Sequence, residues 1–207
     1  MKDTSRRWGD DRALLDDDEA RRLLLDAASR CIVRRGNTQI RMAEVAQEAG
    51  VVRSTVYRYF PGREDLVLGL VLMRIDAALA ALVASLRHPG DATKCLPKMV
   101  LGPADSVVGN PLNEALFATE SVALSTVLEV GSEQIVDAIV QHYGALFDRW
   151  QADGGMYPDL DHREVARWIH TAALLLLSRP WRDRSPAAKR RFVEQFVVRT
   201  LVPQIGH

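Results

Sequence analysis

The sequence predicts an all-α protein of about nine or ten helices, and three observations support this fold class. Apolar residues recur at helical spacing along most of the 207-residue chain, and 47% of all residues are hydrophobic, enough for a sizeable core. The pattern has no runs of alternating apolar and polar residues, which would indicate strands. Two short helical segments, joined by a tight turn at Gly50, form the most specific motif of the chain.

The N-terminal region is predicted to consist of a mobile arm, residues 1–15, and a helix that begins after the acidic run 16–19 and ends at Gly36. Arginines at three positions of the arm could contact DNA, or the arm could be an energetically silent tail. Carboxylates at a helix start complement its dipole. Because consecutive acids on one turn point in different directions, we expect no metal site there. The inward face of this helix is Leu24, Ala27, Ala28 and Cys31.

The segment 41–60 has the pattern of a helix-turn-helix. Its first helix carries one apolar stripe, made of Met42, Val45, Ala46 and Ala49. Gly50 follows, and glycine adopts the left-handed conformation of a helix end without steric cost. The second helix, 53–59, is polar and basic. In proteins with this motif the second helix enters the major groove of DNA.

Charge is concentrated around this motif, although the formal net charge of the chain is zero. Residues 19–63 contain nine arginines and four acidic residues, a net charge of +5. The remainder of the chain therefore carries −5. Since phosphate binding requires a local basic patch, the neutral total does not argue against a DNA-binding protein.

The rest of the chain is predicted to be helical, with breaks at glycine and proline. A long helix is expected over 63–86, and later breaks at Gly102-Pro103 and Asn110-Pro111. Further helices are expected over 115–129, 132–154, 161–178 and 185–201, the second of them capped by Ser132. The residues expected to face inward are Leu66, Leu70, Met73 and Ala77 in the long helix, and Ile135, Ile139, His142, Leu146 and Trp150 in the helix beginning at 132.

The last two helices carry more apolar surface than one buried stripe requires. The stretch 172–177 is almost entirely apolar, and the final helix adds Phe192, Phe196, Val197 and Leu201. We interpret this surplus as an oligomer interface between helices, with ordinary core packing as the alternative.

Over about Glu19–Leu70 the chain resembles the TetR family of transcriptional regulators. The resemblance rests on three motifs, RRG at 34–36, RMAEVAQEAGV at 41–51 and TVYRYFPGREDL at 55–66. Beyond these motifs it is only architectural, because the chain continues with several helices of which the last two are long and apolar.

The resemblance implies a homodimer that acts on double-stranded DNA. Residues 16–62 would form a three-helix DNA-binding domain, and residues 63–207 a helical domain that binds an effector and dimerises through the last two helices. The implied function is that of a ligand-responsive repressor on a palindromic operator. The alternative is a ligand-binding dimer of the same architecture without DNA-regulatory activity.

The resemblance also implies four DNA contacts. Thr55 takes the place of a residue that meets bases or a nearby phosphate, and the Tyr57 and Tyr59 hydroxyls match phosphate-binding positions. Arg63 begins the long helix, where its side chain and the helix N-terminus can hold one phosphate together.

Position and chemistry add four further DNA-binding candidates. Arg53 can read guanine through two hydrogen bonds, and Ser54 and Arg58 share its helix. Arg41, at the start of the preceding helix, could reach the DNA backbone or be simply solvated. Val52 and Arg41 stand where the family usually has a Ser or Thr cap, and a lost cap costs about 0.5–2 kcal/mol. We therefore expect the second helix to fray in the free protein.

The effector is expected to be a largely apolar small molecule held between helices of the C-terminal part. For each candidate contact, a place in the ordinary core is the alternative, and it is the commoner role of such residues. The candidates are Met73, Met99, Phe117, Glu120, His142, Tyr143, Phe147, Trp150, Trp168 and Thr171.

Other classes of protein are not indicated. The five histidines form no HExxH pattern, and the sequence has neither a Gly-rich phosphate loop nor a nucleophile elbow, so we expect no enzyme, metal or cofactor. No charge-free apolar run reaches about 18 residues, and no signal peptide is evident, so a cytoplasmic protein without a membrane partner is expected. Cys31 and Cys95 are expected to be buried reduced thiols, with a redox pair as the alternative.

Overall fold

A computed structural model describes residues 17–107, 109–117 and 131–203. Every regular element in these ranges is a helix, and none is a strand, which confirms the all-α fold class. The predicted arm 1–15 and Glu120 lie outside the described residues. The helices are α1 (Asp17–Arg35), α2 (Met42–Ala49), α3 (Arg53–Tyr59), α4 (Arg63–Ser85), α5 (Ala92–Asp105), α6 (Pro111–Leu116), α8 (Ser132–Ala152), α9 (His162–Leu177), α10 (Arg179–Arg182), α11 (Pro186–Phe192), η1 (Val193–Val198) and α12 (Arg199–Leu201).

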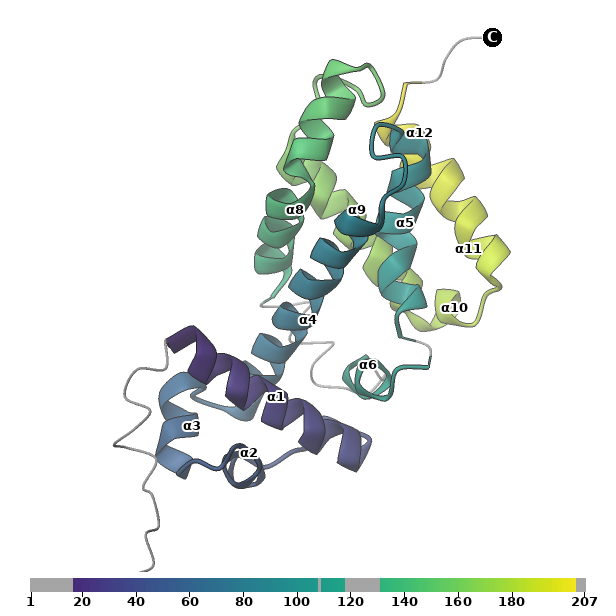
Figure 1. Ribbon diagram of the computed structural model, residues 1–207. Helices are drawn as coiled ribbons and strands as arrows, with labels where there is room; N and C mark the ends of the chain where they lie inside the picture. The colour runs from purple at the N-terminus through teal and green to yellow at the C-terminus, as the bar shows by residue number, and fades with distance from the viewer. Residues whose placement is uncertain (1–16, 108, 118–130, 204–207) are drawn as a thin grey trace, which may run out of the picture.

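Helices α1, α2 and α3 gather at one end of the molecule (Figure 1). α1 packs on α2, and α2 packs on α3. The apolar stripes predicted for α1 and α2 are buried in this group. Gly36 and Gly50, which follow these two helices, have φ values of 70° and 69°. Both are left-handed helix ends, as their positions in the sequence predicted.

α4 runs from this group to the larger helical group at the other end (Figure 1). It packs on α1 and on α8. Leu66, Leu70 and Val71 are buried and Met73 is half-buried, but Ala77 is exposed, contrary to the expectation that it faces inward. The reason is that beyond Val71 the helix is covered on fewer sides, with Leu79 as the only further buried residue of this fully described helix.

By length and composition alone, α4 is apolar enough to cross a membrane. In this structure 28% of its most apolar stretch is buried against the rest of the protein, and a core helix can meet the same criterion. Part of its apolar surface packs on α1 and α8.

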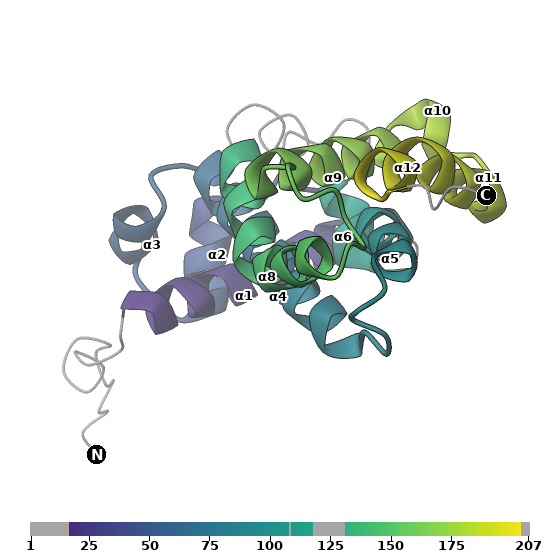
Figure 2. The same ribbon diagram turned by 90° about the horizontal axis from the view of Figure 1, so that it is seen from above.

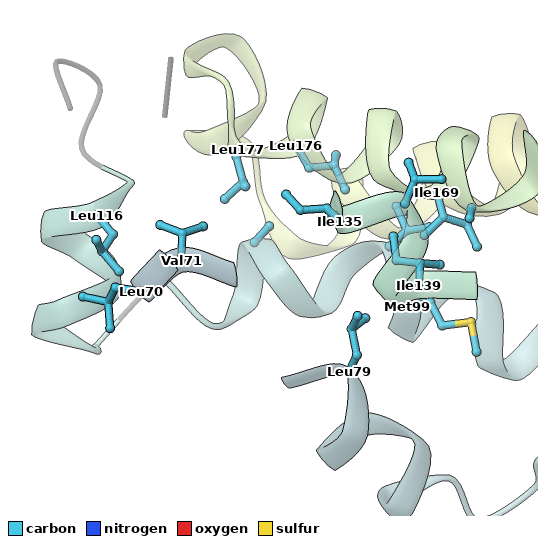
Figure 3. Close-up of a cluster of buried hydrophobic side chains, with 14 of the residues drawn as sticks. Leu70, Val71, Leu79, Met99, Leu116, Ile135, Ile139, Ile169, Leu176 and Leu177 are labelled. Carbon is cyan, nitrogen blue, oxygen red and sulfur yellow. The ribbon is translucent and has the colours of Figure 1, made fainter. Parts of the chain in front are cut away.

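The larger group is built around α8 and α9, with α5 packed on α9 and on η1 (Figures 1 and 2). Its core joins apolar side chains from five helices, among them Leu79 of α4, Met99 of α5, Leu116 of α6, Ile139 of α8 and Ile169 of α9 (Figure 3). Seen from above, α9 through α12 extend to the end of the molecule that lies farthest from α3 (Figure 2). The predicted final helix 185–201 is present as α11, η1 and α12 in direct succession, with η1 in π-helical geometry.

Two of the predicted helix boundaries are wrong. No break occurs at Gly102-Pro103, because α5 continues to Asp105 and contains both Pro97 and Pro103. A proline removes only one backbone donor, and the buried face of α5 holds the helix in place. Ser132 begins α8 but does not cap it, since Gly131 is the capping residue and no side chain accepts a hydrogen bond there.

A third boundary also differs, because α1 begins at Asp17, inside the acidic run and not after it. The predicted helix ends over 36–86 and 132–201 otherwise lie within two residues of the observed ones. Asn110, Asp161 and Ser185 each cap the following helix through a side-chain oxygen. The helix predicted over 115–129 is described only as far as residue 117, and α6 ends at Leu116.

Candidate nucleic-acid interface and internal cavity

The turn between α2 and α3 is a tight one that fixes the angle between these two helices. Gly50 is left-handed, and the Val51 N–H donates to the Ala46 carbonyl at 2.9 Å. In α3, which is described completely, Val56 is the one buried residue. Tyr59 also packs half-buried against the core, so α3 presents outward the face that carries Arg53, Ser54 and Tyr57.

Four of the predicted DNA contacts on α3 are exposed, and Arg58 is one of them. Arg53 and Ser54 are solvent-exposed, and no hydrogen bond or ion pair joins their side chains to the described residues. The Tyr57 side chain is 44% exposed, whereas Thr55 is only half-exposed. Val52, in the capping position, provides no side-chain hydrogen bond, as its apolar side chain predicted.

Arg58 and Tyr59 are held by the first turn of α1. The Tyr59 hydroxyl donates to Asp17 Oδ1 at 2.8 Å and accepts a hydrogen bond from Arg58 Nη2. The Arg58 guanidinium lies 4.6 Å from the centroid of the Tyr59 ring and 3.9 Å from the Asp17 carboxylate. A phosphate bound by these two residues would therefore compete with the Asp17 carboxylate.

Arg63 is the first residue of α4, and two neighbouring residues position its side chain. Its Nη1 donates to Gln39 Oε1 at 2.7 Å, and its Nη2 lies 2.9 Å from Glu64 Oε1. Hydrogen bonds from the helix-start backbone N–H of Glu64 and from Arg63 lower the pKa of the Glu64 carboxyl. Arg41 is exposed, and its backbone N–H donates to Glu44 Oε2 at 3.4 Å.

Three other arginines of the basic segment are exposed but tie α1 to α2 through ion pairs. Arg30 and Arg34 bind the Glu48 carboxylate at 2.7 and 3.0 Å, and Arg35 binds Glu44 at 2.6 Å. Hydrogen bonds, chiefly from Arg30 and secondly from Arg34, lower the pKa of the Glu48 carboxyl. The local charge of +5 therefore overstates the number of arginines that are free to meet DNA.

The missing cap at Val52 leads to a first prediction. We expect Val52→Ser to raise the free energy of unfolding by about 0.5–1 kcal/mol, because a serine hydroxyl in this position accepts a hydrogen bond from a free N–H of the first turn. Urea denaturation followed by circular dichroism measures the change. Val33→Ser, at a 45% exposed position inside α1, is the matched control and should give no gain. An unchanged value for Val52→Ser would show that α3 is already fully formed without a cap.

A cavity of about 490 Å³ lies between α4, α5, α6 and α8. Its lining is mostly apolar, and α4 contributes half of it. The lining residues are Arg74, Ile75, Ala78, Leu79, Ala81, Leu82, Ser85, Met99, Gly102, Pro103, Ser106, Asn113, Phe117 and Tyr143.

Three of the ten residues predicted to contact an effector line this cavity, namely Met99, Phe117 and Tyr143. The α4 contribution was missed, although the sequence carried a signal for it. Ile75, Ala78, Leu79 and Leu82 stand at i, i+3, i+4 and i+7, a second apolar stripe on the long helix.

Four of the other candidates belong to the core or its edge. Phe147 and Trp150 are fully buried, and Trp150 Nε1 donates to the Pro89 carbonyl at 2.6 Å. Met73 packs half-buried against the core, and His142 Nε2 lies 2.7 Å from an oxygen of Asp76.

The two candidates on α9 lie on its outer surface. The Trp168 side chain is 38% exposed and donates to Thr200 Oγ1 at 3.2 Å. Thr171 is exposed, and its hydroxyl donates to the Arg167 carbonyl at 2.8 Å. Neither lines the cavity.

Within the described ranges, no group of three or more His, Cys, Asp or Glu side chains could hold a metal ion. Both cysteines are free and buried, and burial raises the pKa of the Cys31 and Cys95 thiols. A raised pKa suppresses the reactive thiolate, so this geometry favours inert thiols over a redox pair.

Comparison with known proteins identifies the N-terminal region. Residues 24–70 match the family of bacterial regulatory proteins, tetR family. An uncharacterized HTH-type transcriptional regulator of Mycobacterium bovis is 29% identical over 113 residues, 55% of this chain and 58% of that protein. A second such regulator, from Mycobacterium tuberculosis, is 29% identical over 183 residues, 87% of this chain and 84% of that protein. The chain thus spans a little over half the length of the first relative and most of the second.

Solved structures share the fold along most of the chain. The complex of RolR with resorcinol has a TM-score of 0.64 at 15% identity, covering 90% of this chain and 89% of that one. The FadR regulator of Bacillus subtilis in complex with stearoyl-CoA has a TM-score of 0.56 at 17% identity, covering 86% and 97%. At these identities the likeness concerns the fold alone.

Proposed function

We propose that this protein, which belongs to the TetR family of bacterial regulatory proteins, is a ligand-responsive repressor that binds a palindromic operator as a homodimer. We assign DNA binding to residues 16–62, and effector binding and dimerisation to residues 63–207. The observation that carries the proposal is the continuity of α4. It begins at Arg63, beside the helix-turn-helix, and lines the cavity from Arg74 to Ser85.

One continuous helix therefore touches both candidate sites. An occupant of the cavity that favours one tilt of α4 would change the separation of the two α3 helices in a dimer. Those helices must lie about 34–36 Å apart to enter successive major grooves on one face of DNA. Since the two tilts then differ in DNA affinity, ligand binding and DNA binding would be reciprocally coupled.

The proposed dimer interface is formed by α9 and the final helix. Large apolar side chains are exposed on these elements, with Trp168 at 38%, Leu175 at 40% and Phe196 at 57%. α9 contacts η1, so these helices belong to one continuous unit. Exposed apolar side chains on adjoining helices fit an interface between two copies related by a two-fold axis.

The test of this function is a gel shift with the DNA that flanks the gene of this protein, combined with native mass spectrometry. We expect a dimer and a complex of one dimer with one DNA duplex, weakened by added salt. A dimer that gives no shift even at low salt would favour a ligand-binding dimer without DNA-regulatory activity. A monomer would contradict the proposed interface.

A second prediction concerns the reading of bases. Arg53→Ala should relax the preference at one base position of each half-site by about 1–3 kcal/mol, because it removes one bidentate contact with guanine there. Binding to a set of operator variants, each with one changed base pair, measures this effect. Ser54→Ala on the same exposed face is the comparison. If Arg53→Ala weakened binding to every variant equally, Arg53 would be a backbone contact instead.

A further inference from the structure

The polar side chains that line the cavity differ in whether their hydrogen bonds are made. Ser85 and Ser106 donate to backbone carbonyls of their own helices at 2.7 and 2.8 Å. Asn113 donates to the Ser106 carbonyl at 2.8 Å and accepts from Arg74 Nη2 at 3.3 Å. By contrast, Arg74 Nε and Tyr143 Oη are buried and have no hydrogen-bond partner among the described residues.

The charged groups of the cavity lining are of one sign, positive. Among the described residues that line the cavity, Arg74 is the single ionised one and none is acidic. No carboxylate of the described residues forms an ion pair with Arg74. Asp76, two residues along α4, is exposed and bound to His142 at 2.7 Å. The cavity wall therefore carries one partly buried positive charge.

Such an arrangement favours an occupant that supplies the missing hydrogen-bond partners. A buried donor without a partner costs about 1–3 kcal/mol, and a charge costs more. The Tyr143 hydroxyl cannot lower this cost by ionising, because burial raises its pKa far above the usual range. Both groups are donors at neutral pH, so the missing partner is a hydrogen-bond acceptor. Because the Arg74 guanidinium is a cation, an anionic acceptor binds it most strongly.

We propose that the effector is an apolar carboxylic acid, with its hydrocarbon or aromatic body along the α4 and α5 side chains and its carboxylate bound by Arg74 and Tyr143. This inference rests on the proposed function in that it takes the cavity as the effector site. Asn113 acts as a positioning residue, because its amide oxygen holds the Arg74 guanidinium from α6. The volume of about 490 Å³ is typical of a site for a small organic molecule.

Matched probes test the carboxylate directly. Isothermal titration calorimetry of the full-length protein with decanoate, 1-decanol and decylammonium compares one chain with three head groups. The pair 2-naphthoate and 2-naphthol repeats the comparison with an aromatic body. We expect at least one acid to bind at least tenfold more tightly than its alcohol, and decylammonium to bind most weakly. Equal affinity of acids and alcohols, or no binding by either acid, would overturn the proposal.

Variants assign the carboxylate to the two residues. Arg74→Gln should weaken binding of the acid at least tenfold and leave that of the alcohol within about twofold, whereas Arg74→Lys should restore part of the preference because it keeps the charge. Arg22→Gln, an exposed arginine of α1, is the control and should change neither affinity. Loss of acid and alcohol binding together in Arg74→Gln would indicate a structural role for Arg74.

Tyr143→Phe should separate ligand binding from stability. Removal of an unpaired buried hydroxyl is expected to raise the Tm of the ligand-free protein by a few degrees, about 2–4 °C for each kcal/mol in a protein of this size. The same substitution should weaken binding of the acid about fivefold or more. A lower Tm would show that the hydroxyl has a partner in the free protein, and unchanged acid affinity would remove Tyr143 from the site.

A DNA-binding measurement keeps this inference distinct from the proposed function. If the protein binds the DNA that flanks its gene but neither acid, the proposed class of effector is wrong and the proposed regulatory function is upheld. If an acid binds with the expected dependence on Arg74 and Tyr143 but no DNA is bound, the cavity assignment stands and the repressor does not.

Discussion

Phe60→Ala is expected to lower the free energy of unfolding by about 3–5 kcal/mol, the range for removing a fully buried aromatic ring. Phe60 is 1% exposed, and its backbone N–H donates to the Val56 carbonyl at 2.9 Å. The Arg21 guanidinium lies over the Phe60 ring, with its Cζ 4.6 Å from the ring centroid. It therefore fills the junction between α1, α3 and α4.

The neighbouring helix shows how closely this ring is packed. A Cβ atom added at Gly69 would lie 2.9 Å from Phe60 Cε1, so only glycine allows α4 to pass the ring at this distance. Alanine at position 60 would leave a cavity at the point where α4 meets the helix-turn-helix. Because the orientation of α3 relative to α4 depends on this contact, we expect DNA affinity to fall along with stability.

Urea denaturation followed by circular dichroism, at one fixed protein concentration, measures the effect. Tyr57→Ala removes an aromatic ring from the same segment at a position that is 44% exposed, and should change the free energy of unfolding by about 0.5 kcal/mol or less. A loss of under about 1 kcal/mol for Phe60→Ala would mean that the junction can collapse around the missing ring.

The helix-turn-helix was the part of the molecule most readable from sequence, because its features are local. The stripe of α2, the left-handed Gly50 and the uncapped Val52 each depend on a few adjacent residues. The fold class followed from the same helical spacing. Asn110 and Asp161 were equally readable, since a side chain caps the helix that follows it directly.

Features that depend on distant residues were predicted less well. Counting arginines gave the charge of the segment, but only the structure pairs Arg30, Arg34 and Arg35 with acids of α2. Likewise Pro103 reads locally as a helix breaker, yet the packing of α5 on α9 and η1 outweighs one missing hydrogen bond. The cavity required both kinds of information. Its α4 stripe was present in the sequence, but which stripe faces the core and which faces a void is decided by α5, α6 and α8.

Arg63→Ala is expected to weaken DNA binding for every sequence and to reduce its dependence on salt. Each phosphate contact contributes about 0.9 to the slope of log K against log salt, so the loss of one contact per half-site should lower the slope by about 1.8 for a dimer. Arg63 suits this role because it begins α4, where the helix dipole also favours a phosphate. Gln39 and Glu64 hold the guanidinium in place before DNA arrives.

Fluorescence anisotropy with a labelled duplex at several salt concentrations measures the slope. Arg63→Lys should restore the slope, because it keeps the charge, but not the full affinity, because a lysine cannot bind Gln39 and Glu64 with two separate nitrogens of a planar fork. Arg87→Ala, an exposed arginine just beyond the other end of α4, should leave the slope unchanged. An unchanged slope for Arg63→Ala would remove Arg63 from the phosphate contacts. A reduced slope that lysine restores would tie the first residue of α4 to DNA, and so give the helix that lines the cavity a direct contact with the operator.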